Sequence, residues 1–188
     1  ILSNGDIYKI AVSSTGVHKL SYAFLKDQLG IDLDNIDPAR IQLFGNGGGV
    51  LPANIQIERI DDIEENAIWI QGAVDGSFDA SDYLLFFAEG PDRWTYDSNS
   101  GDFNMTKNIY DDRNYYFIKI GSQTGRRISE QASISSTAYT TNTFQDYDRF
   151  EEDRFNLMHE WIRAQGSGKT WYGSHFKVTR EYTFNNLF

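Results

Sequence analysis

The sequence predicts a mainly β protein, built as a β-sandwich or a strongly curved antiparallel sheet with one or two short helices. Short runs of alternating apolar and polar residues recur along the chain and are separated by turn residues. Aromatic residues, which are enriched in strands, are abundant, with 13 Phe, 11 Tyr and 4 Trp in 188 residues. Helical spacing, by contrast, is confined to two short segments.

Strands are expected in the segments that alternate or are wholly apolar, namely 7–12, 17–20, 41–44, 55–58, 68–70, 83–88, 115–120 and 126–128. The first two are separated by a short turn and are expected to pair as a hairpin. Residues 97–101 predict a loop within a polar stretch. Strand-like composition returns at 171–173 and 176–178.

The first helix is expected directly after Ser21, a residue type that caps helix N-termini. Tyr22, Leu25 and Leu29 follow at helical spacing, and Gly30 ends the pattern. A second short helix is expected within 144–163, where apolar residues again recur at roughly helical intervals.

The most apolar part of the chain lies between Ile68 and Trp94. Residues 83–88 contain no charged side chain, and their apolar residues occupy both alternating faces. This pattern predicts a central strand that is covered on both sides. Gly90 and Pro91 end it, because Pro cannot donate to a ladder.

The length suits a single β-rich accessory domain over residues 1–188. Because residue 1 is Ile and not Met, we expect the chain to be a fragment of a larger protein or a processed chain. Residues 129–143 are rich in Ser and Thr, and they predict either a linker or an edge strand.

Composition excludes several classes of function. The net charge of −10 argues against nucleic acid as a partner, because Lys and Arg must replace counterions on phosphate. No apolar run approaches the roughly 18–20 residues of a transmembrane segment. The chain has no Cys, so it contains no disulfide and no cysteine nucleophile.

Two glycine-rich segments imitate nucleotide-binding loops without completing their patterns. Residues 45–49 are followed by Val50, Leu51 and Pro52 where a dinucleotide-binding loop would open a helix. Residues 166–170 lack the first Gly of a P-loop, because that position is Arg163. Both segments are interpreted as turns.

The acidic loop between the two most apolar strands is the candidate metal site. Asp75, Ser77, Asp79 and Asp82 offer the oxygen ligands that calcium prefers, although their spacing is not that of an EF-hand. The alternative is that these carboxylates are solvated turn residues. Calcium is thus the one candidate cofactor.

No catalytic residue is assigned. His18, His159 and His175 show neither an i, i+4 pair nor an H-E-x-x-H motif, so each is interpreted as a packing or surface residue. A freestanding hydrolase that uses a pair of carboxylates is a remaining alternative, but nothing selects the pair.

Five stretches, in order, resemble one known family: residues 15–32, 36–52, 65–97, 106–121 and 166–176. They are similar to the N-terminal region of the PorU family, the gingipain-like cysteine peptidases that act as sortases of the type IX secretion system. The resemblance covers most of the chain. It implies a multidomain protein at the cell surface, on the exterior of the outer membrane of a Gram-negative bacterium.

The resemblance also implies a role. Because the family uses a Cys–His dyad and this chain has no Cys, the chain is expected to be a noncatalytic accessory domain. It would scaffold, or would dock partner or cargo. The implied partners are the downstream peptidase domain of the same chain and the outer-membrane barrel PorV.

Aromatic residues beside glycine-rich turns are the candidate interaction residues, because rings anchor interfaces at low entropic cost. They are Trp94, Trp171 and Tyr172. The same rings support an alternative function, in which the chain is a carbohydrate-binding β-sandwich module that stacks sugars on them. Packing inside the core is the third interpretation.

Overall fold

The computed structural model describes residues 1–34, 36–52, 54–137, 139–143, 150, 154, 171–173 and 178–183. The chain divides into two compact units, Ile1–Ser133 and Ile134–Phe188. Their boundary falls within 129–143, and the described residues of that segment contain no strand. Whether the segment is a linker or an edge strand stays a prediction. The single accessory domain over 1–188 stays a prediction.

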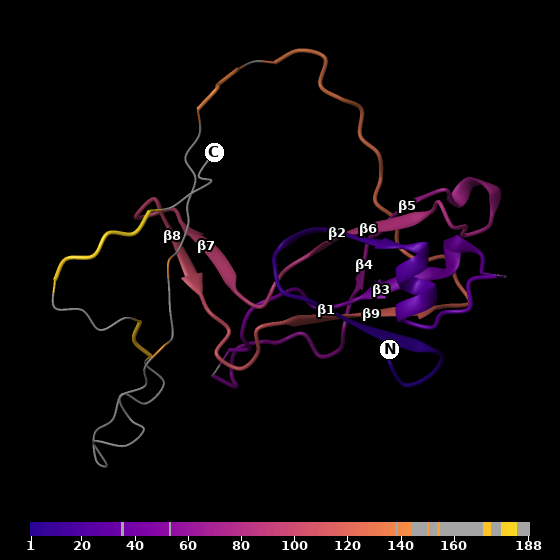
Figure 1. Cartoon of the computed structure of the whole chain (residues 1–188), viewed down its shortest axis with the longest axis horizontal. Helices are drawn as coiled ribbons and strands as arrows, with labels where there is room; N and C mark the ends of the chain where they lie inside the picture. Colours follow the sequence, from indigo (N-terminus) through magenta and orange to yellow (C-terminus); the bar gives the residue numbers. More distant parts are fainter. Residues whose placement is uncertain are drawn as a thin grey trace. The chain divides into compact units, whose positions relative to one another are not determined.

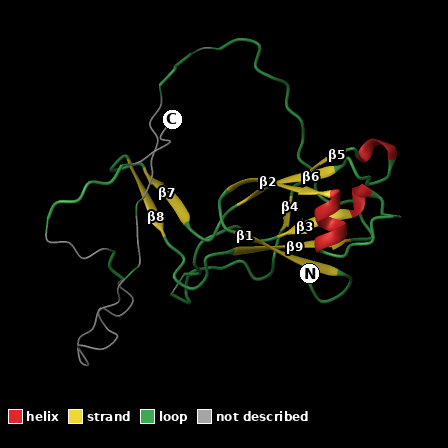
Figure 2. Ribbon diagram, viewed as in Figure 1, coloured by secondary structure: helices red, strands yellow, loops and turns green. Residues whose placement is uncertain are grey.

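The first unit is mainly β, as predicted, with three antiparallel sheets and a sandwich-like fold (Figure 1, Figure 2). The first sheet has the order β1-β9-β3-β4, formed by Ile7–Val12, Asn114–Ile120, Ile41–Phe44 and Glu65–Asn66. The second has the order β2-β6-β5, formed by Gly16–Ser21, Tyr83–Ala88 and Trp69–Gln71. The third contains β7 and β8, Arg93–Asp97 and Asp102–Thr106.

The core is one cluster of buried apolar residues to which the first two sheets both contribute. Ile10 and Ile118 come from the first sheet, and Leu84 from the second. Phe86 of β6 meets Tyr116 of β9 edge-on, with ring centroids 5.6 Å apart. Such a pair contributes about 0.5–1.5 kcal/mol beyond its buried area and ties the two sheets together.

Strand β6 is central in its sheet, as predicted, but only one of its faces is covered. Leu84, Phe86 and Ala88 are buried, whereas Phe87 between them is 56% exposed. The prediction of cover on both sides was wrong. A two-layer sandwich buries one face of each sheet, and an apolar run by itself does not reveal how many layers surround it.

The predicted hairpin between residues 7–12 and 17–20 was also wrong, although both strands exist. Strand β1 pairs with β9, and β2 pairs with β6. The turn between them crosses from one sheet to the other, where the Thr15 hydroxyl accepts a hydrogen bond from Gly90 N–H at 2.9 Å. This crossing lets both apolar faces meet in one core.

The expected first helix is confirmed as a short segment, η1, Phe24–Gln28, which is a single π-helical turn. Ser21 acts at its start, since its hydroxyl accepts the Phe24 N–H at 3.2 Å. Gly30 follows with a φ of 69°, a value that favours glycine. Two further short helices are 3-10 turns, η2 at Pro38–Arg40 and η3 at Ala73–Asp75.

Residues 55–58 do not form the predicted strand. The Asn54 side chain accepts the Gln56 N–H at 2.9 Å, which closes a turn in place of a strand. Residues 98–101 form a turn within the predicted loop 97–101, whose first residue, Asp97, is the last residue of β7; the strands β7 and β8 on either side were not predicted. Instead of a full strand at 126–128, Ile68 and Arg127 form a single parallel bridge.

The glycine-rich segment after β3 is a packed turn, in line with the sequence interpretation. Gly45 lies against the Tyr116 ring, and Gly48 lies against the carbonyl of Gly90, so neither position has room for a side chain. Asn114 donates from its side chain to the carbonyls of Gly47, at 2.7 Å, and Glu89, at 2.9 Å.

Several predictions fall outside the described residues. They concern His159, His175, the turn at 166–170, residues 176–177 and the second helix, of which only Phe150 and Arg154 are described within 144–163.

Candidate functional site

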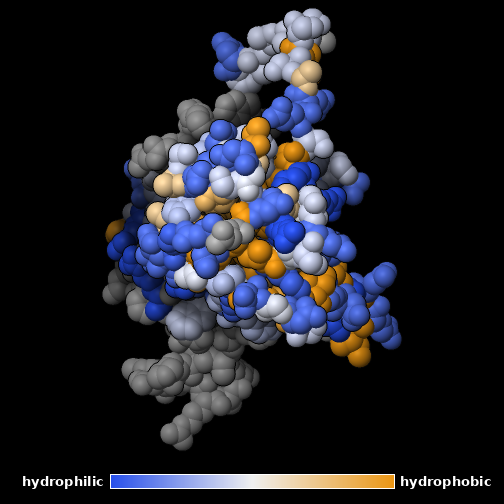
Figure 3. All heavy atoms as spheres, turned by 90° about the vertical axis from the view of Figure 1, so that its right-hand side faces the viewer, coloured by the Kyte–Doolittle hydropathy of each residue, from blue (hydrophilic) through white to orange (hydrophobic). Residues whose placement is uncertain are grey.

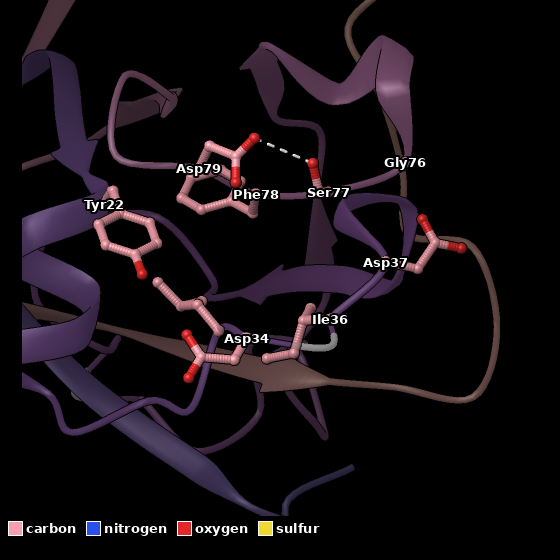
Figure 4. Close-up of a pocket in the computed structure, with 9 residues that line it drawn as sticks. Tyr22, Asp34, Ile36, Asp37, Gly76, Ser77, Phe78 and Asp79 are labelled. Carbon is pink, nitrogen blue, oxygen red and sulfur yellow. Dashed lines mark hydrogen bonds between the residues drawn. The ribbon is translucent and has the colours of Figure 1, made fainter.

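A pocket of about 570 Å³ opens beside the predicted metal loop (Figure 4). Two segments that are distant in sequence supply its walls, one running from the end of β2 to η2 and the other following η3. The lining residues are Tyr22, Leu33, Asp34, Ile36, Asp37, Gly76, Ser77, Phe78 and Asp79. Figure 3 looks toward the end of the first unit that carries η1 and η3, where apolar side chains emerge among hydrophilic ones.

The loop after η3 is held by short-range hydrogen bonds. Gly72 and Gly76 flank η3 with φ of 95° and 81°, a conformation that favours glycine. The Asp75 carboxylate accepts both the backbone N–H and the hydroxyl of Ser77, each at 3.0 Å. The Ser77 backbone N–H, then its hydroxyl, hold the pKa of Asp75 below its usual value. Asp75 therefore stays charged at neutral pH and cannot serve as a general acid there.

Asp82 turns inward and supports the same loop. It is 6% exposed, and its carboxylate accepts the Asp79 N–H at 2.7 Å. A side chain at Gly72 would collide with this carboxylate, so the glycine permits the close approach. The buried Asp82 carboxylate is thus hydrogen-bonded, to the Asp79 N–H and to the Ser81 hydroxyl, as buried carboxylates must be.

The four candidate calcium ligands are neighbours, but their oxygens have different partners. The Ser77 hydroxyl lies 3.0 Å from both the Asp75 and the Asp79 carboxylates, whereas Asp82 faces backbone. Among the described residues, no group of three or more His, Asp or Glu converges as metal ligands do. Calcium at this loop stays a prediction.

Two residues of the opposite wall, Tyr22 and Asp34, hold the ammonium group of Lys26, which does not itself line the pocket. The Lys26 ammonium donates to the Tyr22 hydroxyl and to the Asp34 carboxylate, each at 3.0 Å. The hydrogen bond with Tyr22, followed by that with Asp34, raises the pKa of Lys26. Asp37 in turn accepts the Ala39 N–H at 2.9 Å and caps η2. The pocket carboxylates are thus already engaged in local structure.

Neither His nor Cys is among the residues that line this pocket. The sequence has no Cys, so a cysteine-peptidase reaction cannot take place on this chain. His18 lies on the core side of β2, with its Nε2 3.0 Å from the Ser14 carbonyl and its ring 5.6 Å from that of Phe86. These contacts are those of a packing residue.

The three candidate aromatic residues lie in different units. Trp94 is half-buried in β7, opposite Met105 of β8. Trp171 and Tyr172 belong to the second unit and are each 49% exposed. The Tyr172 carbonyl accepts the Arg154 N–H at 2.9 Å. The structure describes these residues without establishing a shared surface for them.

Sequence reasoning missed a second surface, which we call the outer face of the second sheet. It consists of the side chains of β2, β6 and β5 that point away from the core: Val17, Lys19, Ser21, Trp69, Gln71, Tyr83, Leu85 and Phe87. The sequence signal that could have revealed this face was the alternation in β2 of the charged Lys19 with the apolar Leu20.

The fold and these sites define a mainly β, sandwich-like domain without the thiol of a cysteine peptidase. Neither a family model nor a curated protein matches the sequence. Among solved structures, the chain is similar to dimeric latent PorU from Porphyromonas gingivalis, with a TM-score of 0.52 and 27% identity. The match covers 72% of this chain and 11% of that chain.

This similarity supports the relationship to PorU at the level of the fold. The chain spans only about one tenth of the length of that PorU chain. Within the described residues, we find no helix with the length and apolar character needed to cross a membrane.

Proposed function

We propose that this chain is a noncatalytic N-terminal accessory domain of a gingipain-family cysteine peptidase that acts as a sortase in type IX secretion. Its role is to scaffold the parent protein or to dock partner or cargo at the cell surface. The observation that carries the proposal is the similarity in fold to PorU at 27% identity over 72% of the chain.

The chemistry of the chain supports a role without catalysis. A gingipain-type reaction needs a thiolate, and none of the 188 residues is Cys. Each carboxylate of the pocket already has a partner, because Asp37 accepts the Ala39 N–H, Asp79 accepts the Ser77 hydroxyl and Asp34 is neutralised by Lys26. The outer face of the second sheet, in contrast, exposes apolar side chains that a partner could contact, such as Val17 and Phe87.

The test combines the open reading frame with an activity assay. A His and a Cys of gingipain type should be encoded downstream of Phe188. The parent protein should cleave a type IX cargo, its Cys→Ala variant should not, and this chain alone should show no cleavage. Cleavage by the isolated chain, or a parent without the dyad, would overturn the proposal.

The proposal places the domain on the exterior of the outer membrane, with PorV as a partner. Co-purification of the parent protein with PorV from membranes tests that partner, and a parent lacking residues 1–133 shows whether the first unit contributes. Retention of the full PorV signal by the truncated parent would assign the contact elsewhere.

A carbohydrate-binding module is a second candidate, favoured by the exposure of Trp171 and Tyr172, each 49%. Exposed rings can stack on sugars through their apolar faces. Binding of the chain to a glycan array would support this candidate, and an array without any bound glycan would remove it.

A further inference from the structure

We propose that the outer face of the second sheet is the surface on which the neighbouring folded domain of the same polypeptide packs. The inference rests on the proposed function in one respect, namely that this chain is part of a longer protein. It adds which surface makes the contact.

The strand register makes this face continuous. Val17 lies opposite Phe87, and Leu85 lies between Lys19 on one side and Trp69 on the other. Tyr83 likewise lies between Ser21 and Gln71. Side chains opposite one another on neighbouring strands are in contact range, so the apolar members form one patch.

The patch has the composition of an interface centre. Val17 is 71% exposed and Phe87 is 56% exposed, values that a side chain serving only the core would not show. Trp69 and Tyr83 pack with ring centroids 6.0 Å apart and supply rigid aromatic surface. Trp and Tyr are the residues most enriched among those that dominate binding energy.

Charge distinguishes this face from the rest of the molecule. The chain carries 27 Asp and Glu, yet none of the eight positions of the outer face is acidic. Its one charged side chain, Lys19, has its ammonium 3.8 Å from the centre of the Tyr83 ring. Burial of this face therefore leaves no carboxylate without a partner. The Lys19 ammonium keeps its contact with the Tyr83 ring when water is removed.

The length of the similar protein identifies the occupant. This chain matches only 11% of the PorU chain, so most of such a polypeptide lies outside the structure described here. A domain linked in the same chain is held at a high effective concentration. Interfaces between domains of one chain are also modest in size, so a patch on a three-stranded sheet is sufficient.

Hydroxyl-radical footprinting of the full-length parent protein and of the 188-residue chain tests the proposal. We expect Trp69, Tyr83 and Phe87 to be oxidised several-fold more slowly in the parent than in the chain. Tyr96 of β7, which is 59% exposed and lies outside this face, is the internal reference.

A pair of matched variants separates the contact from a change in folding. Phe87→Asp in the parent should restore oxidation of Trp69 and Tyr83 to the rate of the shorter chain. Val74→Asp should not, because Val74 is fully exposed on η3, outside the face. Neither variant should change the melting temperature of the 188-residue chain by more than a few degrees, because both sites are exposed.

The outcomes are distinct. Equal oxidation in parent and chain overturns the proposal. Protection of the chain alone that grows with its concentration assigns the face to a second copy and also overturns it. Protection in a parent that lacks a gingipain-type dyad supports this inference while refuting the proposed function.

Discussion

The hydroxyl group of Tyr116 offers the sharpest test of how the two main sheets are joined. The side chain is 1% exposed, and its oxygen accepts the Glu89 N–H at 2.8 Å, just beyond the end of β6. Burial raises the pKa of Tyr116. In Tyr116→Phe the ring still packs against Phe86, but the Glu89 N–H loses its acceptor. An unsatisfied group of this kind costs about 1–3 kcal/mol.

The neighbouring residue provides the control. Tyr115 donates from its hydroxyl to Asp111 at 2.8 Å on the outside of the first sheet, where water can replace it. We expect Tyr115→Phe to cost less than about 1 kcal/mol. Urea unfolding of the 188-residue chain, followed by tryptophan fluorescence, measures both variants. Equal losses in the two variants, or no loss in Tyr116→Phe, would refute the reasoning.

Four further predictions use the same chain. Gly48→Ala should lower the free energy of unfolding by roughly 2–4 kcal/mol, because a Cβ there would meet a backbone carbonyl; a neutral result would contradict this packing. If the acidic loop binds calcium, EDTA should lower the melting temperature of the wild type but not of Asp75→Asn, and an unchanged wild type would remove the site. The hydrogen bonds from Ser77 lower the folded pKa of Asp75, so their stabilisation is present above its unfolded pKa of about 4 and is lost as the pH falls through the lower folded value. Acid unfolding of Asp75→Asn should accordingly be less dependent on pH below about 4, whereas unchanged dependence would count against the shift. Trp171→Ala or Trp94→Ala should abolish any glycan binding that the wild type shows, and full retention by both would dissociate binding from these rings.

Individual strands were predictable from the sequence because their signal is local. Strands β1, β3, β6 and β9 lie within a residue of the predicted ranges 7–12, 41–44, 83–88 and 115–120. Each combines side-chain alternation or an apolar run with a turn residue at its end. The hydrogen bond that the Ser21 hydroxyl accepts from the Phe24 N–H is local in the same sense, although Ala23 is the residue directly before η1.

Strand pairing was not predictable, because it depends on contacts between distant parts of the chain. The short connection at 13–15 has the length of a hairpin loop, but it joins two sheets. The β7–β8 hairpin exists but was not predicted, because it has no run of buried apolar residues. Polar strands of a two-stranded sheet look like loop in sequence.

The candidate site likewise has one part that the sequence could predict and one part that it could not. The hydrogen bonds among Asp75, Ser77 and Asp79 lie within five residues and follow from the sequence. The other wall of the pocket, with Tyr22 and Asp34, comes from a segment that is distant in sequence, so only the fold could place it there.

Strand β6 carries apolar residues on both of its faces, although only one face belongs to the core. The side chains that β6 contributes to the core include Leu84 and Phe86. The sandwich therefore does not require apolar residues at the alternate positions, Leu85 and Phe87. An antiparallel sheet with one face in water normally carries polar residues on that face. The outward residues of β6 instead match those of a strand that is covered on both sides, which is why the sequence predicted such cover. Among the described residues of the first unit none covers Phe87, which is 56% exposed, and we infer that a neighbouring domain of the parent protein supplies the missing layer.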